Sequence, residues 1–128
     1  MQSTREKPDF SEVPVFMIRQ RPRVYVAGPY TQGNMLENVR NAIDAGDRLA
    51  SKGFAPYIPH LSHFWDLVHK HDYEFWLDIC LTWVQACDAV LRLPGYCPGC
   101  EREVALAENC GIPIFENEEL LYTYYEVG

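Results

Sequence analysis

The stretch R-V-Y-V-A-G at residues 23–28 decides the fold. It is a short run of β-branched, aromatic and small residues that stops at Gly28-Pro29, which is typical of a buried strand. Residues 34–52 then place apolar or small side chains at the spacing of an amphipathic helix, and Gly53 lies where such a helix ends. Together these segments predict the first strand and the first helix of an α/β protein.

The same alternation continues along the chain. We predict strands at residues 54–58, 88–93 and 112–115, and helices at 73–87, 100–109 and from the cap Asn117 toward Tyr125. Residues 60–70, rich in aromatics and histidine, are predicted to form a loop. In the helix at 73–87 we expect these residues to face inward: Phe75, Trp76, Ile79, Trp83 and Ala86. The alternation predicts a central parallel sheet covered by helices on both faces, a three-layer α/β sandwich.

Length and charge narrow the class of protein. The 128 residues suffice for one domain, which we place at residues 22–128, with residues 1–21 as a flexible N-terminal arm. The net charge of −7 argues against a nucleic-acid polymer as partner, since neutralising phosphates needs clustered Lys and Arg. A small nucleotide stays compatible with this charge, because one helix N-terminus and an arginine can hold it.

The sequence predicts neither a membrane span nor a secretion signal. No uninterrupted apolar run approaches the roughly 20 residues that a membrane helix needs, and residues 1–10 are polar and charged. Five cysteines, an odd number, fit cytosolic thiols better than a disulfide framework. We therefore expect a cytoplasmic protein, and we predict neither a cofactor nor a metal.

The loop after the first strand reads G-P-Y-T-Q-G-N at residues 28–34. In parallel sheets, ligands bind beyond the carboxyl ends of the strands, so Gly28, Pro29 and Tyr30 are candidate ligand contacts. The loop lacks the glycine spacing of a phosphate-binding or dinucleotide-binding motif. The alternative is a plain strand-to-helix turn that Asn34 caps.

The segment after the second strand, P-H-L-S-H-F-W-D at residues 59–66, gathers aromatic and imidazole rings. His60, His63 and Trp65 are candidates for stacking on and hydrogen bonding to a nucleobase. Two alternatives stay open: the histidines bind a metal, or the aromatic residues only close the edge of the core.

The segment after the third strand, P-G-Y-C-P-G-C-E-R-E at residues 94–103, opens a helix. Amides at a helix N-terminus favour an anion, and Glu103 would project beside them while Glu101 points elsewhere. We expect Glu103 to stay ionised at neutral pH, which suits a nucleophile. The alternative is that both acids only complement the helix dipole.

Cys97 and Cys100 form a C-x-x-C pair at the start of this helix. Such a pair can be a redox dithiol, or half of a zinc site with His60 and His63 as partners. It can also be two small hydrophobic residues.

Five segments, taken in this order, resemble the nucleoside 2-deoxyribosyltransferase-like family, which includes deoxyribosyltransferases and nucleoside 5′-phosphate N-glycosidases. They are V-Y-V-A-G-P-Y at 24–30, P-Y-I-P-H-L-S-H at 56–63, W-V-Q-A-C-D-A-V-L-R-L-P-G at 83–95, and G-C-E-R-E-V-A-L-A at 99–107 with G-I-P-I-F at 111–115. The resemblance spans roughly residues 22–120. It implies a flavodoxin-like or Rossmann-like fold and a homo-oligomer in which neighbouring subunits help to complete the sites.

The resemblance also implies a reaction. Glu103, four residues after Gly99, would be a nucleophile that attacks C1′ of a nucleoside or nucleoside 5′-monophosphate, and Tyr25 would position it. Water or a second base would then resolve the glycosyl-enzyme, giving a hydrolase or a transferase.

This chain departs from the family pattern at two cysteines. Cys80 stands where relatives carry an aspartate that helps to protonate or orient the leaving base. Asp78 is then the candidate catalytic acid, although a two-residue offset turns it about 200° around the helix. Cys97 replaces a Ser or Asp that meets the 5′ group, which leaves the amides of Gly99 and Cys100 for a phosphate. A nucleotide-binding module without catalysis is therefore the alternative function.

Overall fold

The computed structural model describes residues 20–128. The part of the predicted arm at residues 1–19 lies outside the described residues. Residue 21 is held against the rest of the fold, because the Arg21 guanidinium donates to the carbonyl oxygens of Ala50 and Phe54, both at 2.9 Å.

Four parallel strands form one sheet in the order β2-β1-β3-β4. They are β1 (Arg23–Ala27), β2 (Ala55–Tyr57), β3 (Ala89–Arg92) and β4 (Ile114–Phe115). The strand order reverses at β1, which lies between β2 and β3. The structure therefore confirms the predicted α/β fold of flavodoxin-like type.

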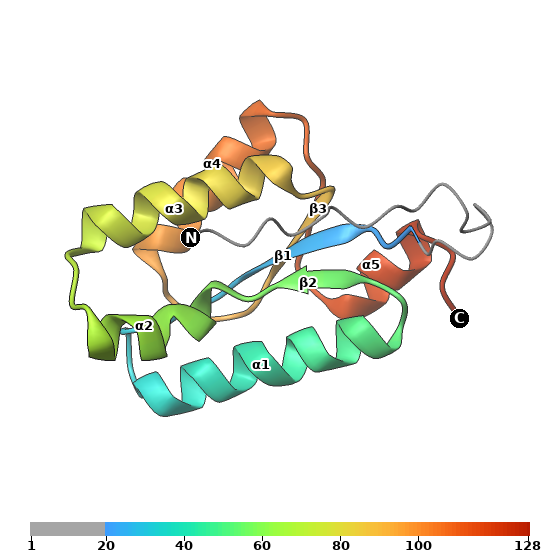
Figure 1. Ribbon diagram of the computed structural model, residues 1–128. Coiled ribbons are helices and arrows are strands. Elements are labelled where there is room, and N and C mark those ends of the chain that lie inside the picture. Colours follow the sequence, from blue (N-terminus) through green and yellow to red (C-terminus); the bar gives the residue numbers. More distant parts are fainter. Residues whose placement is uncertain (1–19) are drawn as a thin grey trace, which may run out of the picture.

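Helices cover both faces of this sheet (Figure 1). Val24 and Val26 of β1 face α1 (Met35–Ser51) and α5 (Glu118–Tyr124). Tyr25 and Ala27 point to the opposite face, toward α3 (Tyr73–Ala86) and α4 (Pro98–Asn109). The alternation of side chains along one buried strand thus feeds two separate cores.

The helix ends follow the local sequence. Asn34, Asp72 and Asn117 each accept a backbone N–H with their side chain and so cap α1, α3 and α5. Gly53 and Gly111, which follow α1 and α4, adopt φ of 98° and 72°. Only glycine takes up this left-handed backbone without strain, so the predicted helix ends are confirmed.

The predicted loop at residues 60–70 is wrong. The chain forms a 3₁₀ turn, η2 (Pro59–Leu61), and then α2 (Ser62–Val68). The last strand is also shorter than predicted, since only Ile114–Phe115 pair with β3.

The inward face of α3 also differs from the prediction. Leu77 and Val84 are buried, whereas Trp83 is 47% exposed and Ala86 is exposed. The ring of Trp83 stacks on Tyr57 at the sheet edge instead of entering the core. Within residues 20–128, no helix is both long enough and apolar enough to cross a membrane.

Candidate active site

Three loops meet at the carboxyl ends of β1 and β3, where the strand order reverses and where α/β proteins of this type bind ligands. Gly28 lies so close to Leu93 that an added Cβ would sit 3.0 Å from its Cδ1. A Cβ on Gly95 would sit 2.8 Å from Pro29 Cγ. The glycines therefore allow the loops after β1 and β3 to pack against each other.

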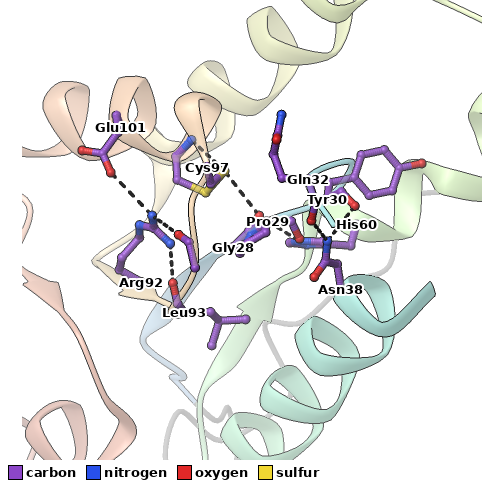
Figure 2. Close-up of a disulfide and its surroundings, with 12 residues drawn as sticks. Gly28, Pro29, Tyr30, Gln32, Asn38, His60, Arg92, Leu93, Cys97 and Glu101 are labelled. Carbon is purple, nitrogen blue, oxygen red and sulfur yellow. Dashed lines mark hydrogen bonds and ion pairs between the residues drawn. A yellow bond between two sulfur atoms is a disulfide. The ribbon is translucent and has the colours of Figure 1, made fainter. Parts of the chain in front are cut away.

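His60 joins the third loop to this edge. Its Nε2 lies 3.0 Å from the carbonyl oxygens of both Gly28 and Pro29 (Figure 2). Because both partners are acceptors, Nε2 carries the proton. Burial lowers the pKa of His60, so the ring is neutral at pH 7. With only 3% of its surface exposed, His60 holds the loops together and offers little ring surface for the predicted contact with a base.

His63 and Trp65, the other two predicted base contacts, reach the surface. His63 Nδ1 lies 2.7 Å from the Tyr30 hydroxyl, which links α2 to the loop after β1. Trp65 is 48% exposed and meets Trp76 edge-to-face, with 4.8 Å between ring centroids. Tyr30, His63 and Trp65 thus have ring surface available for a planar ligand.

Glu103 lies on the α3–α4 side of the sheet beside Tyr25 and Cys80. Glu103 is 8% exposed, and Tyr25 is fully buried. Glu103 Oε2 and the Tyr25 hydroxyl have no hydrogen-bond partner of good geometry within residues 20–128. Each group nevertheless shifts the pKa of the other, so they are close neighbours. The structure therefore brings together the predicted nucleophile and its predicted positioning tyrosine.

Burial controls the charge of Glu103. Desolvation raises its pKa to about 7, against smaller lowering effects of the Tyr25 hydroxyl and the Arg92 charge. The expectation that Glu103 is fully ionised at neutral pH is therefore wrong. The helix dipole acts mainly within the first turn, and α4 begins at Pro98, so Glu103 lies beyond its strongest effect.

Asp78 does not face Glu103. Its side chain is exposed on α3, and the position that faces Tyr25 and Glu103 is Cys80. Burial raises the pKa of the Cys80 thiol to about 11. Among the described residues, Glu103 is the only buried carboxylate.

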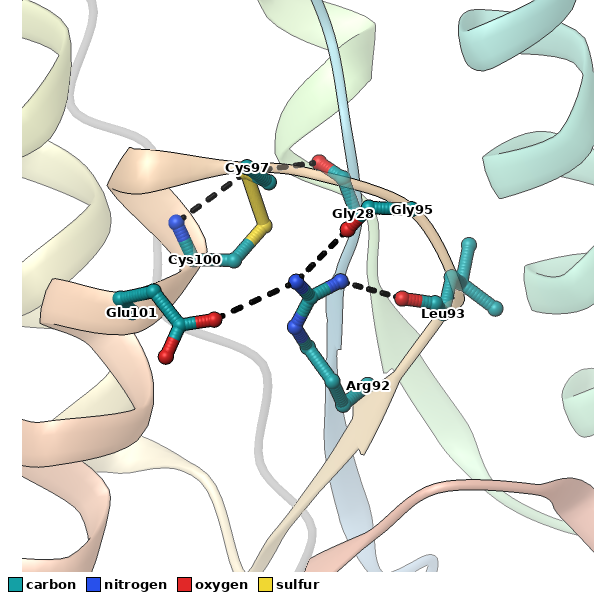
Figure 3. A network of polar contacts seen from close by, with 7 residues as sticks. All are labelled: Gly28, Arg92, Leu93, Gly95, Cys97, Cys100 and Glu101. Atoms are coloured by element: carbon teal, nitrogen blue, oxygen red, sulfur yellow. Dashed lines mark hydrogen bonds and ion pairs between the residues drawn. A yellow bond between two sulfur atoms is a disulfide. The ribbon is translucent and has the colours of Figure 1, made fainter.

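Arg92 is a further candidate site residue, which the sequence did not single out. Its guanidinium donates to the carbonyl oxygens of Leu93 and Gly95, the latter at 2.9 Å, and lies 3.5 Å from Glu101 (Figure 3). It thus fixes the loop that leads into α4 and supplies positive charge near Glu103. A lone cation in the apolar run D-A-V-L-R-L was the available signal.

Cys97 and Cys100 form a disulfide across the first turn of α4 (Figure 2). The expectation that all five cysteines are thiols is therefore wrong for this pair, whereas Cys80, Cys87 and Cys110 are free. Cys97 also caps α4, because its Sγ accepts the N–H of Cys100 at 3.1 Å. The Cys100 amide is thus occupied, which leaves the Gly99 amide as the remaining candidate donor of the predicted phosphate site.

Two observations bear on other kinds of site. Within the described part of the chain, no three His, Cys, Asp or Glu side chains converge as metal ligands, so the zinc alternative gains no support. A cavity of about 410 Å³ lies on the α1–α5 side, lined by residues that include Pro29, Asn38, Arg48 and Pro94. Glu103 does not line it, because α4 covers the opposite face.

The fold and its switch-point site define a flavodoxin-like α/β protein with a buried glutamate on the helix after β3. The chain belongs to the family described as Domain of unknown function (DUF4406), whose model matches residues 22–116.

Among solved structures, the fold is similar to that of a 2-deoxyribosyltransferase from Bacillus psychrosaccharolyticus, described as a biocatalyst for nucleoside synthesis. The two share 18% sequence identity with a TM-score of 0.58, over 72% of this chain and 69% of that one. No curated protein matches the chain.

Proposed function

We propose that this protein cleaves or transfers the N-glycosidic bond of a deoxynucleoside or nucleoside 5′-monophosphate, with Glu103 as nucleophile. The observation that carries the proposal is that Glu103, on the helix that follows β3, is buried beside Tyr25. The fold adds support, since it is similar to that of a 2-deoxyribosyltransferase.

The reaction follows two-step glycosyl transfer. The ionised Glu103 carboxylate attacks C1′, the C1′–N bond breaks, and the base leaves with the bonding electrons and takes up a proton. Water or a second base then attacks C1′ of the glycosyl-enzyme and regenerates the carboxylate. Tyr25 and the Arg92 charge both favour the ionised form of Glu103, as their effects on its pKa show.

The substrate would lie across the three loops. Tyr30, His63 and Trp65 offer partly exposed rings for the base. We propose that Pro29 contacts the ligand beside these rings, that the buried Gly28 only shapes this edge, and that the Gly99 amide binds the 5′ group. With the Cys100 amide bonded to Cys97, this site has fewer donors for a phosphate, which favours a nucleoside over its monophosphate.

A base-release assay tests this function. The protein is incubated with a panel of deoxynucleosides and their 5′-monophosphates, with and without a second base, and free base is measured by chromatography. We expect release by the wild type and a loss of at least about 10³-fold in Glu103→Gln, because a nucleophile cannot be replaced by its amide. Glu101→Gln is the matched control, since Glu101 is exposed on the same helix, and it should keep most of the activity.

The proposal fails if no substrate releases base, or if Glu103→Gln is as active as Glu101→Gln. The first of these outcomes favours a second candidate function, a nucleotide-binding module without catalysis. The observation behind it is that Cys80 faces Tyr25 and Glu103 at the position where an acid would be needed, whereas Asp78 is exposed. It predicts that nucleosides raise the melting temperature without product formation.

We further propose that the protein acts as a homo-oligomer in the cytoplasm. Four apolar residues of α2 are exposed, between 48% and 75%: Phe64, Trp65, Leu67 and Val68. A surface of this kind on a short helix is typical of a contact between subunits.

A further inference from the structure

The disulfide at the start of α4 joins a partly exposed cysteine to a buried one. Cys97 is partly exposed between the exposed residues Tyr96 and Pro98, whereas Cys100 is fully buried in the core beneath α4. The Cα atoms lie 5.2 Å apart, within the usual range for a disulfide. Cys97 is therefore the cysteine of the pair that an external thiol can approach.

The surroundings of Cys97 suit a sulfur that alternates between bonded and anionic forms. Its Sγ accepts the Cys100 N–H at 3.1 Å, and α4 extends away from it for 12 residues. Both the N–H donor and the helix N-terminus favour a thiolate here. The Arg92 guanidinium donates a hydrogen bond to the Gly95 carbonyl oxygen at 2.9 Å and adds positive charge to the same loop (Figure 3).

The other cysteines lack this environment. Burial raises the pKa values of the Cys80 and Cys87 thiols to about 11, so both resist ionisation at neutral pH. Cys110 is exposed, but it follows the C-terminal end of α4, where the helix dipole disfavours an anion. Reactive thiol chemistry is thus concentrated at Cys97.

We propose that Cys97 and Cys100 form a reversible thiol–disulfide centre that accepts two electrons from a low-molecular-mass thiol. Cys97 is the sulfur that exchanges with the external partner, and Cys100 is the resolving cysteine. The centre is independent of whether Glu103 acts on nucleosides.

The exchange proceeds in two steps. A thiolate of the reductant attacks Cys97 Sγ, the Cys97–Cys100 bond breaks, and the Cys100 sulfur leaves as a thiolate that takes up a proton. A second reductant thiolate attacks the sulfur of the first, which releases Cys97 as a thiolate and yields the disulfide of the reductant. Two electrons pass to the protein, and the reverse sequence reoxidises it.

The redox state of Cys97 affects its contact with the loop after β1. Cys97 Sγ lies 3.7 Å from the carbonyl oxygen of Gly28, the oxygen that also accepts a hydrogen bond from His60. A disulfide sulfur has neither a proton to donate to this oxygen nor a charge, whereas the reduced sulfur donates to the oxygen as a thiol and repels it as a thiolate. Reduction therefore changes the contact between α4 and the loop that His60 holds.

The test uses the full chain with Cys110→Ser, which removes the exposed free thiol. The protein is equilibrated without denaturant in glutathione buffers of graded potential, quenched with acid, then alkylated in denaturant so that the buried Cys100 is also labelled, and weighed by mass spectrometry. We expect two more alkylated cysteines at the reducing end than at the oxidising end, with peptide mapping to Cys97 and Cys100. The proposal is overturned if the folded protein keeps the disulfide at every potential, or if it never forms a disulfide at any potential.

Two variants in the same background assign the roles. With oxidised glutathione, Cys100→Ser should form a mixed disulfide on Cys97 at least tenfold faster than Cys97→Ser forms one on Cys100. Equal rates, or a faster reaction at Cys100, would overturn the assignment of Cys97. Circular dichroism checks that both variants are folded. If one variant is unfolded, the titration of the protein with both Cys97 and Cys100 still decides whether the disulfide is reversible.

Discussion

At Glu103, burial disfavours the ionised carboxylate that the proposed nucleophilic attack requires. Removing a carboxylate from water raises its pKa, and here burial prevails over the Tyr25 hydroxyl and the Arg92 charge. A pKa of about 7 leaves the group near half-ionised at neutral pH. A nucleophile that is poorly hydrated and only just ionised is more reactive than one that water stabilises fully.

The raised pKa of Glu103 predicts a stability that falls as pH rises. Between the ordinary value of 4.5 and the folded value of about 7, the folded state binds more protons than the unfolded state. The stabilisation is therefore complete below pH 4.5 and is lost above pH 7, a change of about 3 kcal/mol. Glu103→Gln stays neutral, so urea unfolding should give equal stabilities near pH 4.5 and a more stable variant at pH 8. A difference that does not change with pH would contradict the burial of this charge.

Tyr25→Phe tests the positioning tyrosine. The hydroxyl lowers the pKa of Glu103, so its removal should move the pH midpoint of base release upward. We expect a loss of about tenfold at pH 6 and a much smaller loss at pH 9. Stability should change by less than about 1 kcal/mol, since the hydroxyl has no partner of good geometry among the described residues. A loss of activity that is equal at all pH values would exclude this role.

At the scale of elements, the loop from β3 to α4 is the part that shapes the site. Gly95 makes its turn at φ of 117°, its carbonyl oxygen accepts from Arg92, and its Cα faces Pro29. The loop can take this course only because residue 95 has no side chain.

Gly95→Ala should therefore destabilise the protein by about 2–3 kcal/mol, through backbone strain together with the clash with Pro29. Gly111→Ala is the matched control, because Gly111 also has a positive φ but no atom within 4 Å of an added Cβ. It should cost about 1 kcal/mol. Thermal unfolding compares the two, and equal losses would show that the contact with Pro29 carries no weight.

The sequence predicts most of the elements and misses those without local signals. Asn34, Gly53, Asn117 and Gly111 mark helix ends by their own chemistry, and the structure places helix ends there. The helix α2 has no side-chain cap at its start and follows directly on a 3₁₀ turn, so the usual start signal is missing. The last strand is limited to two residues partly because Pro113 has no N–H to donate.

For the site, sequence indicates which residues are present, whereas tertiary contacts decide what they do. His60 looks like a base contact until its Nε2 is seen bonded to two carbonyl oxygens of another loop. The charge of Glu103 depends on how much water the sheet and α3 exclude, which no short sequence window records. The C-x-x-C spacing of Cys97 and Cys100 is compatible with two thiols and with a disulfide, so the sequence alone does not distinguish these states.

At the scale of the whole molecule, the exposed apolar side chains of α2 predict self-association. Phe64 and Leu67 are 67% and 68% exposed, which is unfavourable in a monomer. Analytical ultracentrifugation should show a dimer or larger oligomer, and Phe64→Asp should shift it toward the monomer. Leu120→Asp, at an exposed position on α5 and away from α2 (Figure 1), is the control and should leave the oligomer intact. A monomeric wild type would contradict this part of the account.

The central claim is that Glu103 carries the sugar during the reaction, and trapping that intermediate tests it most directly. The protein is mixed with a deoxynucleoside substrate, quenched in acid within the first turnover, digested, and its peptides are weighed. The account predicts a deoxyribosyl adduct on the peptide of α4, located at Glu103 and absent from Glu103→Gln. Base release without any adduct, or an adduct on another residue, would contradict it.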